Sequence, residues 1–182
     1  MRGRHPVARA ARPLRTLPTR WLMTDERQGE GLWRALERLP RGGGVIFRHY
    51  ATPAIERRRL FDRVRRVAQR RGLIVVRAGE RRMRGEQGVH ARRGGGIVTW
   101  PAHDRREAVR GVRAGADLLF VSPLFGTRSH PGAKAIGPLR AASIARRLGV
   151  PVIALGGMDE RRWRRARGLG FAGFAAIDAW GK

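Results

Sequence analysis

Short apolar runs alternate with amphipathic stretches along most of the chain. The runs that predict strands lie near residues 21, 45, 73, 88, 97, 117, 151 and 172. Most are continuous, as in Leu73–Val76 and Asp117–Val121, which is typical of parallel strands buried on both faces. Eight strands alternating with helices in one domain predict an α/β fold of the (β/α)₈ barrel type.

Helices are expected in several of the intervening stretches. Thr52 followed by Pro53 predicts a helix start with proline at the first helical position, and Gly72 is expected to end that helix. Asp104 with Glu107 predicts a capping pair for a helix reaching about residue 113. Two shorter helices are expected over about 139–148 and, capped by an aspartate, about 159–167.

The chain has 182 residues, whereas this barrel typically takes about 250. The stretches that follow the strands at Leu73 and Val89 show no helical periodicity. We therefore expect a compact barrel whose helices after strands three and four are short or absent. A six-stranded open α/β sheet is the alternative architecture.

The first twenty residues differ in composition from the rest. They hold six arginines, three prolines and no acid, and they lack the apolar stretch of a secretory signal. The sequence thus predicts a flexible basic extension over 1–20 and a barrel domain over 21–182. The absence of cysteine and of any long apolar run excludes disulfide frameworks and a membrane span, and favours a cytoplasmic protein.

The net charge of +26 comes almost wholly from arginine, since Lys134 and Lys182 are the only lysines. Arginine is spread through nearly every segment and is not clustered among aromatic residues, which favours a solvated surface over a specific nucleic-acid site. Such a surface still attracts polyanions at low salt. A non-enzymatic polyanion or nucleic-acid binder is therefore one hypothesis.

Polar residues follow almost every predicted strand, at the end of a barrel where function resides. Four of the five histidines are among them. Arginine offers a bidentate fork to phosphate, hydroxyl groups add donors, and a Gly-Gly pair before a helix lets backbone N–H groups approach an anion. The candidates for such an anion pocket are Arg48, His49, Arg77, His90, His103, Ser122, Thr127, Ser129, His130, Gly156 and Gly157.

The residues themselves give little support for a metal site. Acids at this end are limited to Asp25, Asp104 and Asp178, and Asp104 is better placed as a helix cap. His90 and His103 lack the spacing of a zinc site.

The chain is similar to thiamine phosphate synthase and its TenI-like relatives over about residues 21–180. The most specific pieces are Ser-Pro-x-Phe-x-Thr-x-Ser after strand six and Ala-x-Gly-Gly-Met at strand seven. The full set of matching stretches is 21–25, 44–50, 88–90, 103, 116–131, 151–158 and 173–178.

The resemblance implies a (β/α)₈ barrel that joins an aminopyrimidine pyrophosphate to a thiazole phosphate, releases pyrophosphate and uses Mg²⁺. It also implies a possible homo-oligomer. By position, Arg48 would contact pyrophosphate, Thr127 and Ser129 would form the phosphate-binding hydroxyl pair, and Gly157 with the backbone near Ile177 would hold the thiazole phosphate. We expect Arg48, His103 and His130 to be catalytic and the remaining candidates to bind substrate.

The chain departs from the family pattern at the expected metal site. An Asn-Asp pair after strand three is replaced by residues 76–79, Val-Arg-Ala-Gly, and the acid after strand four by residues 91–94, Ala-Arg-Arg-Gly. Lysine positions carry Tyr50 and His130, and a serine position carries Asp178. Arg77, Arg92 and His130 would then supply positive charge in place of the ion.

A TenI-like relative is the competing enzyme hypothesis. It would act on a thiazole phosphate by proton transfer, or merely bind it. The acid/base group would be His49, His103 or His130, because histidine titrates near neutral pH.

Overall fold

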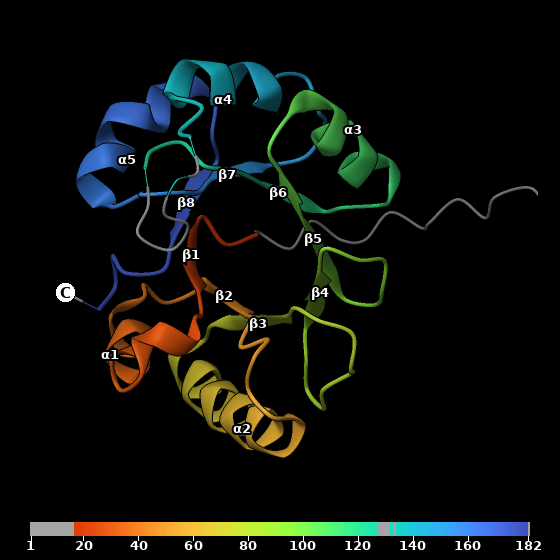
Figure 1. Cartoon of the computed structure of the whole chain (residues 1–182), viewed down its shortest axis with the longest axis vertical. Coiled ribbons are helices and arrows are strands. Elements are labelled where there is room, and N and C mark those ends of the chain that lie inside the picture. Colours follow the sequence, from red (N-terminus) through yellow and green to blue (C-terminus); the bar gives the residue numbers. More distant parts are fainter. Residues whose placement is uncertain (1–16, 127–131, 133, 182) are drawn as a thin grey trace, which may run out of the picture.

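The computed structural model describes residues 17–126, 132 and 134–181. Within these residues eight parallel strands pair in sequence order, and β1 pairs with β8 to close a barrel (Figure 1). The predicted (β/α)₈ barrel is confirmed, and the open six-stranded sheet is wrong. The strands are β1 (Arg20–Met23), β2 (Gly44–Phe47), β3 (Ile74–Arg77), β4 (Gly88–His90), β5 (Ile97–Ala102), β6 (Leu118–Val121), β7 (Val152–Ala154) and β8 (Gly173–Ala176).

Helices cover the barrel unevenly. Between β3 and β5 the described chain forms only loops and the strand β4, as expected from the missing periodicity, and Figure 1 shows these loops beside β3 and β4. No helix in the described part of the chain is long and apolar enough to cross a bilayer. The helices are α1 (Gly31–Arg38), α2 (Ala54–Arg71), α3 (Arg105–Arg113), α4 (Pro138–Ala145) and α5 (Glu160–Ala166), with 3₁₀ turns η1 (Glu26–Gln28) and η2 (Arg167–Leu169).

Helix boundaries follow the predicted caps with small corrections. Gly72 ends α2 in the left-handed conformation, at φ +65°. Pro53 is the N-cap of α2 and not its first helical residue, so the predicted start at Thr52 was one residue early. Asp104 caps α3 as predicted, but the Glu107 side chain accepts from the N–H of His103 instead of returning to Asp104. The helix expected to reach residue 148 ends at residue 145.

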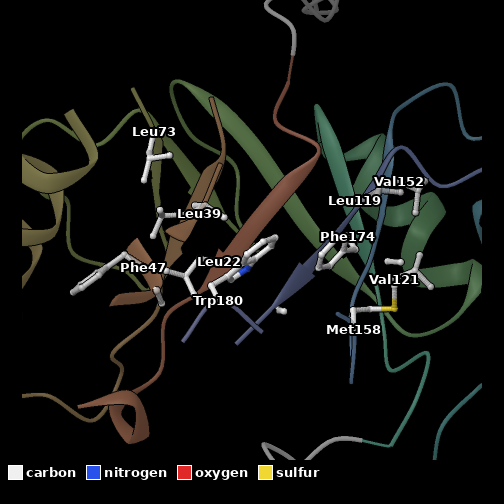
Figure 2. Packing of buried hydrophobic residues seen from close by; sticks show 14 of the residues in the cluster. Leu22, Leu39, Phe47, Leu73, Leu119, Val121, Val152, Met158, Phe174 and Trp180 are labelled. Atoms are coloured by element: carbon white, nitrogen blue, oxygen red, sulfur yellow. The ribbon is translucent and has the colours of Figure 1, made fainter. Parts of the chain in front are cut away.

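Alternate residues of each strand enter two different apolar layers. Trp21, Ile46 and Phe120 belong to a cluster inside the barrel, whereas their neighbours Leu22 and Phe47 pack between the barrel and the helices. Figure 2 shows part of this outer layer, which also contains Leu119, Val121 and Phe174. Successive side chains of a strand point to opposite faces, so both faces of the sheet are apolar here.

The interior is narrow enough to need glycine opposite its largest side chain. Trp21 pairs with Gly44 in the neighbouring strand, where a Cβ would lie 2.3 Å from the indole ring. The Trp21 ring also meets Phe120 edge to face, with centroids 5.4 Å apart. These side chains fill the interior of the barrel below the carboxyl ends of the strands.

Residues 17–20 belong to the barrel. The indole N–H of Trp21 donates to the carbonyl of Pro18 at 2.7 Å, and the N–H of Phe174 donates to the carbonyl of Thr19 at 2.9 Å. Arg20 starts β1 and forms an ion pair with Glu160 at 3.1 Å. Residues 17–20, which were expected to belong to the basic extension, therefore contact the barrel, and the rest of the expected extension, 1–16, is outside the described residues.

Candidate functional site

A cavity of about 330 Å³ opens at the carboxyl ends of the strands. This is the end of a parallel barrel where function is expected, and the volume suits a small ligand. Its walls come from every strand end except that of β3: Met23, Arg48, Tyr50, His90, Pro101, His103, Phe120, Ser122, Pro123, Leu155, Gly156, Gly157, Met158, Ala176, Ile177, Asp178 and Ala179.

Most of the described candidates meet in this cavity. Seven of them line it: Arg48, His90, His103, Ser122, Gly156, Gly157 and Ile177. Thr127, Ser129 and His130 lie outside the described residues. His49 and Arg77 do not line the cavity, although both were among the expected binding residues.

Both misplaced residues point away from the barrel axis. His49 has φ +35°, and its ring stacks on Phe47 of the outer layer, with centroids 5.0 Å apart. Arg77 is 3% exposed and pairs with Glu86 beside β3. The reason is strand alternation, because each is one residue out of step with an inward neighbour, Arg48 or Val76.

Arg48 is the main cation of the cavity wall and is held firmly. Its N–H donates to Thr24 Oγ1 at 2.9 Å, its Nε to the Thr24 carbonyl at 3.1 Å, and its Nη2 to Asp25 Oδ2 at 2.7 Å. Asp25 Oδ1 accepts from Arg27 Nε at 2.8 Å. Burial alone would raise the pKa of Asp25, but the hydrogen bonds from Arg27 and the charges of both arginines bring it below its ordinary value. The carboxylate is therefore ionised and orients Arg48.

His90 lies at the inner end of the cavity. Its Nδ1 is hydrogen-bonded to Thr99 Oγ1 at 2.9 Å, and its ring meets Phe120 edge to face at 5.7 Å. Burial, aided by the charge of Arg48, lowers the pKa of His90 to about 4. The imidazole is thus neutral at neutral pH and acts as a hydrogen-bonding group.

The opposite wall is made mostly of backbone. Gly156 and Gly157 have φ of +95° and +60°, and a Cβ would lie 2.6 Å from Pro123 Cα at the first position and 2.6 Å from the Gly126 carbonyl oxygen at the second. The N–H of Phe125 donates to the Gly156 carbonyl at 3.1 Å. The loops after β6 and β7 therefore lie against each other, and only glycine fits between them.

A glutamine side chain that was not among the expected site residues links the loops that follow β1 and β8. Gln28 Nε2 donates to the carbonyl of Ile177 at 2.7 Å, and its Oε1 accepts from the N–H of Asp25 at 2.9 Å. The spacing Asp-x-x-Gln in 25–28 is a capping-box pattern and could have revealed this turn. Asp178, next along the chain, adds a carboxylate to the cavity wall.

His103 and Glu107 form a polar pair at the mouth. His103 Nδ1 and Glu107 Oε2 are 2.8 Å apart, and the same oxygen accepts from the N–H of His103 at 2.8 Å. These bonds, the backbone one foremost, lower the pKa of Glu107. A histidine oriented by an ionised carboxylate is suited to proton transfer, and His103 itself is 60% exposed.

The donor set does not fit the Mg²⁺ site that the resemblance implies. In the described ranges no group of three His, Asp or Glu residues could hold a metal ion. Both oxygens of Asp25 accept from arginines. Beyond β3 and β4, where the family pattern has acids, Arg92 donates to the carbonyl of Gly79 at 3.1 Å.

The chain matches the sequence model of the thiamine monophosphate synthase family over residues 61–180. It is 35% identical over 81 residues to a putative thiamine-phosphate synthase 2 from Aquifex aeolicus, a match that covers 44% of each chain. It is also 35% identical over 79 residues to a thiamine-phosphate synthase from Chloroflexus aurantiacus, covering 43% of this chain and 37% of the relative. These matches thus span less than half the length of either relative.

The fold resembles a solved structure over nearly its whole length. A thiamine phosphate pyrophosphorylase from Pyrococcus furiosus superposes with a TM-score of 0.75 at 21% identity, covering 91% of this chain and 88% of that one. At this identity the likeness concerns the fold.

Proposed function

Because the chain belongs to the thiamine monophosphate synthase family, we propose that its cavity joins an aminopyrimidine pyrophosphate to a thiazole phosphate. The carbon–oxygen bond to pyrophosphate breaks at the pyrimidine methylene, and a bond from that carbon to the thiazole nitrogen forms. The observation that carries the proposal is that Arg48, His90 and the Gly156–Gly157 turn line a single cavity at the carboxyl ends of the strands.

The main task of the protein in this reaction is to stabilise the departing pyrophosphate. Arg48 is the cation oriented for that role, since Thr24 and Asp25 fix its guanidinium. His90 is uncharged at neutral pH, so its imidazole is available as a hydrogen-bonding group without first losing a proton. The Gly156–Gly157 backbone on the opposite wall leaves space for a phosphate oxygen to approach N–H groups.

The proposal assigns no step to Mg²⁺, which the family resemblance implies. The described cavity offers a pyrophosphate the guanidinium of Arg48, its histidines and the hydroxyl groups of Tyr50 and Ser122. Asp178 adds a negative charge to the wall and interacts with Arg27. We expect the pyrophosphate to bind against Arg48, because this is the arginine that lines the described cavity and can offer charge-assisted hydrogen bonds.

The test is direct. The purified chain is mixed with both substrates, with and without Mg²⁺, and thiamine phosphate is quantified chromatographically. Arg48→Met is the inactive control, and Arg58→Met, at an exposed position on α2, is the matched active one. Absence of product under both metal conditions would exclude synthase activity.

A TenI-like proton transfer on a thiazole phosphate is the second candidate. The specific observation that favours it is the His103–Glu107 pair at the cavity mouth, with a separation of 2.8 Å. The expected result is isomerisation in deuterated water with label entering the thiazole, lost in His103→Gln. Label entry at the same rate in His103→Gln would remove His103 from this role.

A further inference from the structure

Arg57 is buried in α2 just behind the cavity wall, at 8% exposure. It does not line the cavity, and neither the composition nor the strand-end residues point to it. The position falls on the apolar stripe of α2, in phase with Phe61, Val64 and Ala68, which are buried against the barrel. A long cation in such a stripe is unusual, because burying an arginine is costly unless all its donors are satisfied.

The partners of Arg57 are the carbonyl groups where two strands end. Nε donates to the His49 carbonyl at 2.8 Å, and Nη2 donates to the carbonyls of Arg48 at 2.8 Å and Ala78 at 2.7 Å. One guanidinium group therefore joins the end of β2 to the end of β3. β3 contributes no residue to the cavity wall, and the Arg57 bond adds to the direct link between the strand ends that the N–H of Ala78 makes to the carbonyl of Phe47 at 3.0 Å.

The surroundings of the guanidinium are shaped to hold it flat. Its Cζ lies 5.2 Å from the centroid of the Phe47 ring. Gly79, where φ is +87°, also lies beside the guanidinium, since a Cβ at this glycine would be 3.4 Å from Nη2. An arginine in this place thus has stacking and bidentate geometry that a lysine ammonium lacks.

The turn that Arg57 holds is the one that presents Arg48. His49 has φ +35°, a conformation that residues other than glycine rarely adopt and that persists only when surrounding contacts enforce it. The turn is contacted by Arg57 on one side. On the other side, besides the Asp25 and Phe47 contacts described above, Thr24 Oγ1 accepts from the Arg48 N–H and is hydrogen-bonded to His49 Nδ1 at 2.9 Å. Loss of Arg57 would remove the bonds to the carbonyls of Arg48 and His49, which are among the contacts that can enforce this conformation.

We propose that Arg57 is a positioning residue, which holds the Arg48–His49 turn in its strained form and thereby aims the Arg48 guanidinium into the cavity. The affinity for pyrophosphate rests on the proposed function, whereas the shape of the turn does not. The experiment therefore measures both quantities separately.

The first measurement is native-state amide hydrogen exchange in the full chain, comparing the wild type with Arg57→Lys, Arg57→Met and Arg58→Met. We expect the Arg48 N–H, which donates to Thr24 Oγ1, to lose about tenfold or more of its protection in both Arg57 variants. Arg58→Met should leave it unchanged. Protection of the Ile46 N–H in β2 serves as the internal control for global unfolding, and Arg57→Lys provides a variant that keeps the charge if Arg57→Met does not fold.

The second measurement is the dissociation constant of inorganic pyrophosphate by calorimetry. It should rise about tenfold in Arg57→Lys and Arg57→Met, stay within twofold in Arg58→Met, and recover in Arg57→Ala when guanidinium is added at a non-denaturing concentration. Recovery would show that a guanidinium group in this site restores the affinity without a covalent link to α2. Pyrophosphate that fails to bind the wild type refutes the proposed function and leaves exchange to decide on Arg57. Unchanged Arg48 protection in the Arg57 variants refutes the role of Arg57, whatever the pyrophosphate result.

Discussion

The two walls of the cavity are built from different materials. On the side of β1 and β2 the wall depends on charged side chains, with Arg48 held by Asp25 and supported from behind by Arg57. On the side of β6 to β8 it depends on backbone, with Gly156 and Gly157 packed against the preceding loop. In the proposed function the first wall supplies affinity for an anion and the second supplies the space, so damage to each should be visible in a different measurement.

Damage to the glycine wall should have the largest effect on stability. In Gly156→Ala the added Cβ would lie 2.6 Å from Pro123 Cα at a residue with φ +95°. We expect a loss of about 3 kcal/mol in the free energy of unfolding, from overpacking and backbone strain together. Urea denaturation measures it.

Gly149→Ala is the matched control for this substitution. Gly149 also has positive φ, at +73°, but nothing lies within 4 Å of its Cβ position. It should lose only about 1 kcal/mol, from the backbone conformation alone. Equal losses in the two variants would contradict the close packing of the Gly156 turn.

Damage to the arginine wall should appear in binding. Arg48→Met removes charge-assisted hydrogen bonds to an anion. We expect the dissociation constant of pyrophosphate to rise roughly thirtyfold, which corresponds to a loss of about 2 kcal/mol in binding free energy. Arg58→Met should bind as the wild type does. Calorimetry at constant salt checks this, and undiminished affinity in Arg48→Met would move the anion site away from Arg48.

His90 lies between the two walls and should give a pH signature. Its pKa is about 4 in the folded protein and about 6.5 when unfolded. Between these pH values the unfolded chain binds a proton at His90 that the folded protein excludes. The stabilisation from neutral His90 is therefore fully present above pH 6.5, and the free energy of unfolding falls as the pH decreases below that value. His90 should lower the free energy of unfolding by about 2 kcal/mol as the pH falls from 6.5 to 5.

The comparison protein for this pH dependence is His90→Asn. The pKa of His49 is also lowered, mainly by burial, but His49 contributes equally in both proteins. Denaturation curves across this range should therefore be less steep in pH for the variant. Parallel pH profiles would mean that His90 is not held neutral by burial.

The smallest effect is expected at the mouth. Glu107→Gln removes the carboxylate partner of His103, which is mostly exposed, so the loss in unfolding free energy should be below about 1 kcal/mol. Pyrophosphate affinity should remain within twofold of the wild type by calorimetry. A large loss of affinity would show that the His103–Glu107 pair, on the α3 side of the mouth, also contributes to pyrophosphate binding.

The candidate site was only partly predictable from the sequence. Four of the expected residues, Arg48, His90, His103 and Ser122, line the cavity, since each closely follows or ends a strand. Each is also in step with the inward-facing residues of its strand, whereas His49 and Arg77 are out of step and point outward. The continuous apolar runs conceal this phase, since inward and outward positions are equally hydrophobic.

Arg57 was missed for a related reason. Its position among the buried residues of α2 was readable from the helical spacing, but an arginine-rich helix makes one further arginine unremarkable. Its three carbonyl partners come from residues 48, 49 and 78, and only the folded chain brings them together.

The order of strands and helices, and the missing helices after β3 and β4, were determined by the sequence alone, because local periodicity and capping residues specify elements within a few residues of themselves. Tertiary structure decided which side of each strand faces the barrel axis, and so which polar residues share the cavity. That choice depends on closing the sheet around Trp21 and Phe120, a packing requirement spread over all eight strands.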